Sequence, residues 1–279
     1  MAKMVPYWYK SSLWSCYWRD KLKKAREQIP LPSVFLYFRY LNSLLRGRLV
    51  HPKTKFLIFG QGRTGSTLLT SLLNSHPEIT CDGEILARRV LNPLLYVTCK
   101  SRIQSASEVY GFKVKIYQLT RTQKLDDVIG FFKRLIEDQW QVIYLKRENL
   151  LRHAISNMIA ENTRLYHRFS DDQAFCKKKI NVNYQQLLIR MEKRERFQEA
   201  ELEVLEHIHY IPLIYERNLV DADAQQETVD MLCDLIEISR CPVQTNLVRI
   251  NRGTLSNIVC NYHEIRTKIE QTRFAQFLD

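Results

Sequence analysis

The sequence has no apolar run long enough to cross a lipid bilayer. Its strongest candidate, VFLYFRYLNSLL at 34–45, contains Arg39 and falls well short of the roughly 20 apolar residues that a spanning helix needs. The N-terminal residues lack an apolar stretch followed by a small-residue cleavage site, so we expect no secretory signal. Internal repeats and low-complexity runs are absent as well, which argues against repeat and fibrous architectures.

The cysteines provide neither a disulfide framework nor a zinc site. There are seven, an odd number, scattered along the chain without a C-x-x-C pair or a histidine at zinc-ligand spacing. They are Cys16, Cys81, Cys99, Cys176, Cys233, Cys241 and Cys260. We interpret them as reduced thiols of a cytoplasmic protein, and we expect no bound metal.

Acidic residues are scarce only at the N-terminus, and this explains the net charge of +12. Residues 1–55 hold twelve Lys and Arg against two acidic residues, whereas the remaining 224 residues hold 30 against 28. The same segment carries Trp8, Trp14 and Trp18, three of the four tryptophans. Two interpretations of this basic, aromatic-rich arm stay open: contact with an anionic membrane surface, or packing on the main domain. A charge excess confined to one arm gives little support for nucleic-acid binding.

Strand and helix patterns alternate after the arm. The apolar run KFLIF at 55–59 has the character of a strand buried in a parallel sheet, and the leucines of STLLTSLL follow at helical spacing. Further strands are predicted at 110–116, 141–145 and 209–215, and helices at 125–138, 149–160, 184–206 and 226–238. Pro212 indicates an irregular or edge strand. The pattern predicts an α/β, three-layer, P-loop-like fold with a central parallel sheet flanked by helices and ligands at the carboxyl ends of its strands.

A small-residue loop, GQGRTGST at 60–67, joins the first predicted strand to the first helix. A helix N-terminus presents unpaired N–H groups and a partial positive charge, and glycines let the backbone approach a ligand closely. Hydroxyl groups of Thr64, Ser66 and Thr67 and the guanidinium of Arg63 add donors and charge. The loop therefore predicts an anion site.

The identity of the anion is narrowed by what the loop lacks. A nucleotide-triphosphate loop carries lysine after its last glycine and draws on an aspartate that supports Mg²⁺. Here Ser66 takes the lysine position, and the strand at 141–145 is followed by Lys146 and Arg147. A P-loop kinase or NTPase would lack two of its parts, although it stays as an alternative, together with a non-catalytic basic binding module.

Two separate motifs resemble the sulfotransferase family that uses 3′-phosphoadenylyl sulfate (PAPS). The run from Arg63 to Thr67 is similar to its 5′-phosphosulfate loop, and Arg147 with Ser156, in VIYLKRENLLRHAISNMIA, resembles the pair that recognises the 3′-phosphate. The nine-residue spacing of that pair, and NSHPEITCDGEIL at 74–86, resemble the bacterial branch that includes the trehalose and Nod-factor sulfotransferases. The resemblance implies a sulfotransferase domain at 55–279, and the basic N-terminal arm at 1–54 is not part of it. The implied cofactor-binding residues are Gly62, Arg63, Thr64, Gly65, Ser66, Thr67, Arg147 and Ser156.

The same resemblance implies roles in the chemistry. Glu84 is the expected general base, with His76 as the other candidate, and Arg63 is expected to stabilise charge on the donor's bridging oxygen. No metal is implied, because a sulfuryl group carries less negative charge than a γ-phosphoryl group. Gly253, with its neighbour Arg252, is a further candidate contact to the 3′-phosphate.

Two further lysines are candidates for the acceptor site. Lys113 and Lys115 lie on a predicted strand, where they either line an acceptor channel or, for at least one of them, form a solvated strand face.

PAPS would be the donor and adenosine 3′,5′-bisphosphate the product. The acceptor would be a carbohydrate or glycolipid, with a hydroxylated secondary metabolite as the alternative. We expect a cytoplasmic enzyme, in contact with a membrane if the arm binds lipid, and no nucleic-acid partner. No pattern in the sequence indicates an oligomeric state.

Overall fold

The structure, a computed structural model, describes residues 31–104, 107–163, 179–247 and 253–278. Five parallel strands form one sheet in the order β2-β3-β1-β4-β5. The strands are β1 Thr54–Phe59, β2 Ile79–Cys81, β3 Val109–Val114, β4 Trp140–Lys146 and β5 Ile211–Ile214. The predicted α/β fold with a central parallel sheet is confirmed, and the strand that contains Pro212 lies at one edge.

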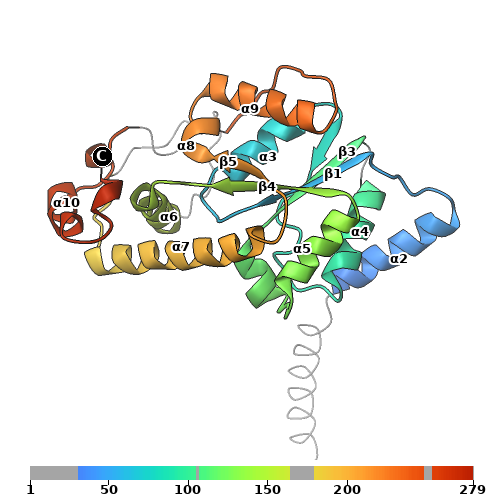
Figure 1. Cartoon of the computed structure of the whole chain (residues 1–279), viewed down its shortest axis with the longest axis horizontal. Coiled ribbons are helices and arrows are strands. Elements are labelled where there is room, and N and C mark those ends of the chain that lie inside the picture. The colour runs from blue at the N-terminus through green and yellow to red at the C-terminus, as the bar shows by residue number, and fades with distance from the viewer. Residues whose placement is uncertain (1–30, 105–106, 164–178, 248–252, 279) are drawn as a thin grey trace, which may run out of the picture.

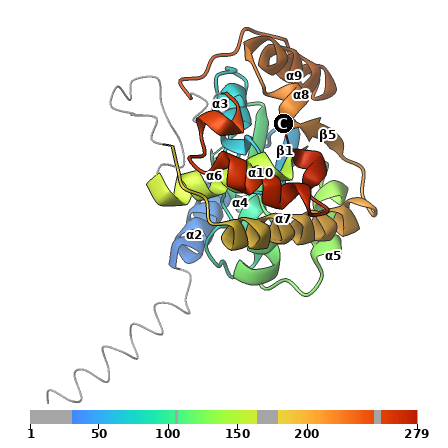
Figure 2. The same ribbon diagram turned by 90° about the vertical axis from the view of Figure 1, so that its left-hand side faces the viewer.

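Helices cover both faces of the sheet and complete three layers. Figure 1 shows α3, α8 and α9 on one face and α4, α5 and α7 on the other, and Figure 2 shows the same arrangement from the side. Helices α6 and α10 lie beyond the carboxyl ends of the strands (Figure 1). The helices are α2 Leu31–Leu45, α3 Ser66–Asn74, α4 Pro93–Gln104, α5 Val128–Glu137, α6 Leu150–Thr163, α7 Tyr184–Leu205, α8 Tyr215–Asn218, α9 Ala222–Leu235 and α10 Tyr262–Glu270. Shorter turns are η1 Gln118–Thr122, η2 Leu255–Asn257 and η3 Ala275–Phe277.

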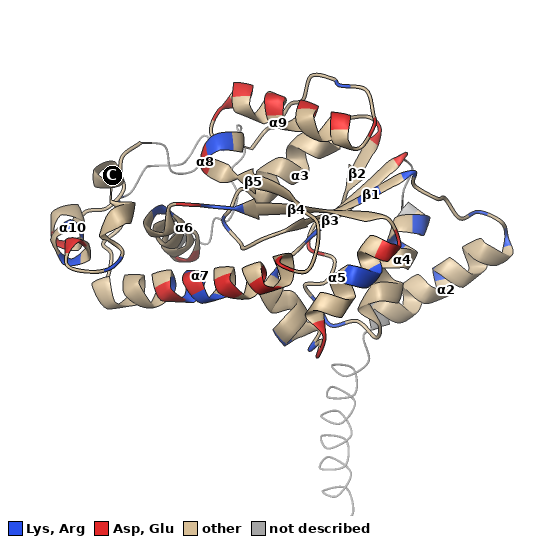
Figure 3. Ribbon diagram, in the orientation of Figure 1, with Lys and Arg blue, Asp and Glu red and all other residues tan. Residues whose placement is uncertain are grey.

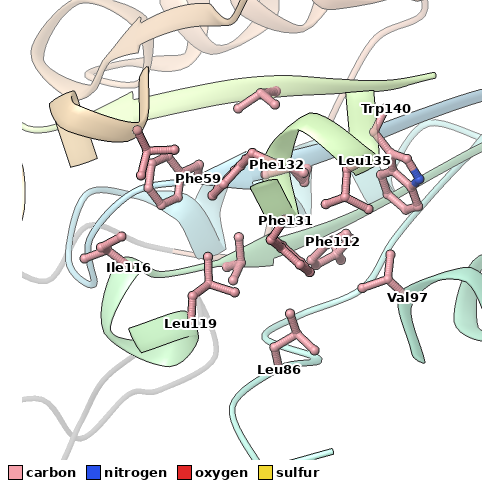
Figure 4. Packing of buried hydrophobic residues seen from close by; sticks show 14 of the residues in the cluster. Phe59, Leu86, Val97, Phe112, Ile116, Leu119, Phe131, Phe132, Leu135 and Trp140 are labelled. Atoms are coloured by element: carbon pink, nitrogen blue, oxygen red, sulfur yellow. The ribbon is translucent and has the colours of Figure 1, made fainter. Parts of the chain in front are cut away.

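Strand β1 is buried on both faces at residues 56–59, as the apolar sequence of these four residues predicts. Because side chains alternate along a strand, Phe56 and Ile58 pack toward α3, whereas Leu57 and Phe59 pack toward α5. On the α5 side the ring of Phe59 meets the ring of Phe132 edge to face, with centroids 4.8 Å apart (Figure 4). The two cores hold the central strand, and with it the loop that follows, in a fixed position.

Side-chain caps set the first residues of three helices. Asp127 accepts a hydrogen bond from the Gly130 amide at 2.7 Å, and Asn183 and Asp221 cap α7 and α9 in the same way. Each cap satisfies one of the N–H groups that a helix start leaves unpaired. These caps explain why α5 begins three residues later, and α9 four residues earlier, than the apolar spacing predicts.

Helix α2 belongs to the segment assigned from the sequence to the arm, and it packs on α4. Tyr37 donates a hydrogen bond to the Asn92 carbonyl at 3.2 Å, and Tyr40 accepts one from Arg102 at 3.1 Å. The tryptophans and tyrosines at 7–18 lie outside the described residues, so the boundary after residue 54 stays a prediction. Within the described ranges, the length and apolar character that a membrane-crossing helix requires are not found together in any helix.

Candidate active site

The predicted anion loop lies at the carboxyl end of β1, where α3 begins. Gly60 has φ 154°, and a Cβ atom there would lie 2.2 Å from the Leu145 carbonyl oxygen. Gly65 has φ 90°, and its Cβ atom would lie 2.6 Å from the ring of Tyr215. Only glycine meets both the backbone conformation and the close approach at these positions. The two glycines therefore press the loop against β4 and α8.

Arg63 adopts a left-handed conformation, with φ 72°, although it carries a side chain. Such a conformation is uncommon for residues other than glycine and recurs at functional sites. The Arg63 side chain lines the cleft described below, and its Nε donates a hydrogen bond to the Ser156 Oγ at 3.4 Å. The loop and the second predicted motif, distant in sequence, meet at this contact.

The three hydroxyl residues of the loop have different orientations. Thr64 is 1% exposed and donates to the Gln61 carbonyl at 2.8 Å, so its hydroxyl shapes the loop. Ser66 and Thr67 line the cleft. They belong to the first turn of α3, whose N–H groups have no acceptor within the helix. The hydroxyl and amide donors expected for an anion thus come from the start of α3.

A lysine on the neighbouring strand reaches the loop. Lys113 of β3 donates a hydrogen bond from Nζ to the Thr67 Oγ1 at 2.8 Å and is 9% exposed. Burial lowers its pKa, which the nearby Glu84 carboxylate partly offsets. Lys115 follows on the same side and is also largely buried. The expectation that at least one of these lysines is a solvated strand-face charge is therefore wrong, because both turn toward the loop.

Glu84 follows β2 and lies between these two lysines. Its Oε1 is 2.7 Å from the Lys115 Nζ and 3.8 Å from the Lys113 Nζ, and its Oε2 accepts from the Gln118 Nε2 at 2.7 Å. Burial alone would raise the pKa of this carboxyl, but the hydrogen bond and charge of Lys115, with the charge of Lys113, lower it below its usual value. The lysines keep Glu84 ionised beside the loop.

Neither His76, the other candidate base, nor the buried His153 lines the cleft. His76 is 3% exposed; its Nε2 bonds the Ser239 carbonyl at 2.8 Å, and its Nδ1 accepts from the Glu78 amide at 3.2 Å. His153 is buried, and its Nε2 lies 2.7 Å from the Gly62 carbonyl. Burial, with the adjacent Arg194, holds the pKa of His153 well below the ordinary value, so the neutral ring donates to the loop. His76 holds a turn, and His153 supports the anion loop.

Arg147 contacts the loop but does not line the cleft, and its charge is paired with that of Glu216. Its Nε is 3.5 Å from the Glu216 Oε1, its guanidinium stacks 4.8 Å from the centroid of Tyr215, and its Nη1 donates to the Arg63 carbonyl at 3.4 Å. Its partner is thus Glu216, and not the adjacent Glu148. Arg147 and the buried Ser156 both touch Arg63, but neither lines the cleft.

A network from α7 fixes the second residue of the loop. Gln61 donates to the Arg194 carbonyl at 2.9 Å and to the Glu201 Oε2 at 3.4 Å, and Arg194 donates to the Gly62 carbonyl at 3.2 Å. Tyr144 donates to the same Glu201 oxygen at 3.2 Å. Burial raises the pKa of Glu201 to about 7 and lowers that of Arg194 to about 10. This network could not be predicted, because α7 has the alternating charges of a solvated helix (Figure 3).

The loop, Glu84 and α7 enclose a cleft of about 650 Å³. It is lined by Gly62, Arg63, Ser66, Thr67, Glu84, Lys115, Tyr117, Arg121, Asn157, Glu161, Gln186, Ile189, Arg190, Lys193, Arg194 and Phe197. Its size suits a ligand larger than a single anion. Within the ranges that the structure describes, no three His, Cys, Asp or Glu side chains gather as a metal site would require.

The remaining candidate contact is only partly described. Arg252 lies outside the described residues, and the Gly253 carbonyl accepts a hydrogen bond from Arg152 at 3.1 Å. A role of this segment at the 3′-phosphate stays a prediction.

Comparison with known proteins finds similarity among solved structures. No protein-family model matches the chain. No curated protein matches it in sequence. Among solved structures, a sulfotransferase from Alicyclobacillus acidocaldarius is similar, with 12% sequence identity and a TM-score of 0.46 over 82% of this chain and 93% of that one. The similarity spans most of both chains at an identity too low to relate individual residues.

Proposed function

We propose that the protein is a sulfotransferase that transfers a sulfuryl group from PAPS to an acceptor hydroxyl. The observation that carries the proposal is Lys113, which joins the anion loop at Thr67 to the carboxylate of Glu84. A cation-lined anion site directly beside an ionised carboxylate is what transfer of an anionic group to a hydroxyl requires. The carboxylate takes the proton, and the cations hold the group that leaves.

The loop fits the phosphosulfate end of the donor. Ser66 and Thr67 offer hydroxyls at a helix N-terminus, and Arg63 and Lys113 add positive charge. The absence of Cβ atoms at Gly60 and Gly65 gives the loop its tight course against β4 and α8. Arg147 and Ser156 are proposed for the 3′-phosphate from the sequence resemblance, and their contacts with Arg63 connect that end of the site to the loop.

The proposed chemistry assigns one task to each side chain. PAPS, when bound, supplies an activated sulfuryl group whose transfer leaves negative charge on a phosphate oxygen. Arg63 and Lys113 provide the positive charge that stabilises it. Glu84 accepts the proton of the acceptor hydroxyl at a carboxylate oxygen. Lys115 and Gln118 hold that carboxylate in place and ionised.

Residue identities favour this activity over phosphoryl transfer from ATP. Ser66 stands where a nucleotide-triphosphate loop has its lysine, and β4 is followed by Arg147 where such a protein has an acidic metal ligand. We propose a carbohydrate or glycolipid as the acceptor, a cytoplasmic location, and, as one of the two interpretations of the arm at 1–54, contact with membrane lipid. These last three assignments rest on the sequence alone.

Thermal-shift titrations with adenosine 3′,5′-bisphosphate, ADP and ATP, each with and without Mg²⁺, test the proposal. A ligand at 100 times its dissociation constant stabilises a protein by about 2.7 kcal/mol. We expect a metal-independent shift with the bisphosphate that is lost in Arg63→Gln. The control Arg134→Gln, which removes an exposed cation from α5 outside the cleft, should keep it. Equal or larger shifts with Mg²⁺ and ATP would defeat the proposal.

A further inference from the structure

Two aromatic rings and two cations line one part of the cleft. We name Tyr117, Arg121, Lys193 and Phe197 the outer wall. The ring centroids of Tyr117 and Phe197 are 5.7 Å apart. The Arg121 guanidinium lies 5.5 Å, and the Lys193 Nζ 5.7 Å, from the centroid of Phe197. Arg121 belongs to η1 and Tyr117 directly precedes it, whereas Lys193 and Phe197 belong to α7. The outer wall therefore joins two distant parts of the chain.

The outer wall is continuous with the proposed base. Lys115 approaches Glu84 to 2.7 Å and also lies 5.6 Å from the centroid of Tyr117. Arg147 and Ser156, by contrast, reach Arg63 from outside the cleft. A molecule whose hydroxyl meets Glu84 from within the cleft would therefore extend along the outer wall, and not toward Arg147.

The charges of the cleft are unequally balanced. Its two carboxylates are paired: Glu84 with Lys115, and Glu161 with Arg190, which donates to both of its oxygens at 3.0 and 2.6 Å. Arg121 and Lys193 are exposed and have no carboxylate within ion-pair distance among the described residues. The outer wall thus offers two cations to a ligand.

We infer that the acceptor is an anionic carbohydrate, a sugar chain that carries a carboxylate or ester sulfate near the hydroxyl to be modified. This inference rests on the proposed function. Aromatic side chains pack against the apolar face of a sugar ring, and the flanking cations bind the anionic substituent. A neutral sugar would use the rings but would offer Arg121 and Lys193 no anionic partner. The wall therefore selects among carbohydrates by charge.

Calorimetric titration with two tetrasaccharides tests the inference, in the presence of saturating adenosine 3′,5′-bisphosphate. One is an unsulfated chain of alternating glucuronic acid and N-acetylglucosamine, and the other is the neutral chain of N-acetylglucosamine alone. We expect the carboxylated chain to bind about tenfold more tightly at low salt, because two exposed ion pairs contribute on that order. The preference should shrink as NaCl is added.

Paired substitutions locate the preference. Arg121→Gln with Lys193→Gln should reduce it to within about threefold, since the ion pairs that create it are gone. The matched control, Lys133→Gln with Arg134→Gln, removes one lysine and one arginine from the exposed side of α5 and should leave it unchanged. Reversal of charge, Arg121→Glu with Lys193→Glu, should make the neutral chain the better ligand.

The outcomes separate this inference from the proposed function. Failure of the wild-type protein to bind the bisphosphate overturns the proposed function itself. Normal bisphosphate binding with equal affinity for the two tetrasaccharides, or a preference that survives the outer-wall substitutions, overturns only the inference. Loss of bisphosphate binding in the Arg121 and Lys193 variant would assign the outer wall to the donor and would also overturn it.

Discussion

The Nε of Arg63 lies 3.4 Å from the Oγ of Ser156, although 93 positions separate the two residues in the sequence. Arg63 belongs to the loop after β1 and Ser156 to the helix after β4. These strands are neighbours in the sheet, so their carboxyl ends place the following segments side by side. Arg147, directly after β4, also contacts Arg63, because its Nη1 donates a hydrogen bond to the Arg63 carbonyl.

Replacement of Arg147 by alanine should weaken binding of adenosine 3′,5′-bisphosphate by about ten- to a hundredfold, or roughly 1.5 to 3 kcal/mol. A charged hydrogen bond to the 3′-phosphate would be lost, and the Arg63 carbonyl would lose its donor. Isothermal titration calorimetry gives the dissociation constants directly. Arg217→Ala removes an exposed arginine from nearby α8 and serves as the control. A variant that loses stability but keeps its affinity would show that Arg147 only supports the loop.

Glu84→Gln should abolish transfer while bisphosphate binding persists. The amide keeps the size of the side chain but cannot accept the acceptor's proton. Transfer can be followed as radiolabelled sulfur that passes from PAPS to components of a cell extract, with the product identified by its added SO₃ mass. Retained turnover in this variant would reject Glu84 as the base.

The pH dependence of transfer should reflect the lysines around Glu84. Because the pKa of Glu84 lies below its ordinary value of 4.5, the carboxylate is ionised at neutral pH and the rate should fall only on the acidic side of that value. Lys115→Met removes a hydrogen bond and a positive charge that favour the carboxylate, so it should raise this pKa and move the acid limb to higher pH. An acid limb at the same pH in both proteins would contradict the assignment.

The fold and the loop could be predicted because both depend on short, local sequence patterns. An uninterrupted apolar run such as that of β1 indicates a strand buried on both faces, and the glycines after it indicate a tight turn before a helix. Helix α4 was not predicted, because its apolar residues show little of the 3.6-residue periodicity of an amphipathic helix. The edge strand β2 is only three residues long, too short for any pattern.

The surroundings of the loop could not be predicted, because they depend on tertiary packing. Lys113 reads as an ordinary strand lysine until the register of β3 beside β1 brings it to Thr67. Gln118 and Glu201 are likewise indistinguishable in sequence from solvated residues. The pairing of Arg147 with Glu216, in place of its neighbour Glu148, follows from β5 lying next to β4 in the sheet.

Glu201→Gln should stabilise the protein progressively as the pH rises. The folded-state pKa of about 7 lies above the ordinary value of 4.5, so between these values the folded protein holds more protons than the unfolded chain. Its free energy of unfolding therefore falls as the pH rises from 4.5 to 7, and the neutral amide removes this loss. The relative gain above pH 7 should approach about 3 kcal/mol.

Urea unfolding at a series of pH values measures this difference. Glu203→Gln, at an exposed position of the same helix, is the control and should show no comparable trend. A stability difference between wild type and Glu201→Gln that stays constant with pH would mean that Glu201 is ionised throughout, and the raised pKa would be wrong.

Gly60→Ala should be among the most destabilising single substitutions in the chain. Its Cβ atom would lie 2.2 Å from the Leu145 carbonyl oxygen, and this oxygen belongs to the backbone of β4, which cannot move without disturbing the sheet. We expect the free energy of unfolding to fall by more than about 3 kcal/mol, together with loss of bisphosphate binding, because the loop would be displaced from α3.

Gly47→Ala, at φ 62° with no atom within 4 Å, isolates the backbone strain and should cost only about 1 kcal/mol. Gly83→Ala meets no atom within 4 Å and has no positive φ, so it should be close to neutral. Equal losses in the three variants, measured by urea unfolding, would show that the close contact between the loop and β4 does not determine the stability of this site.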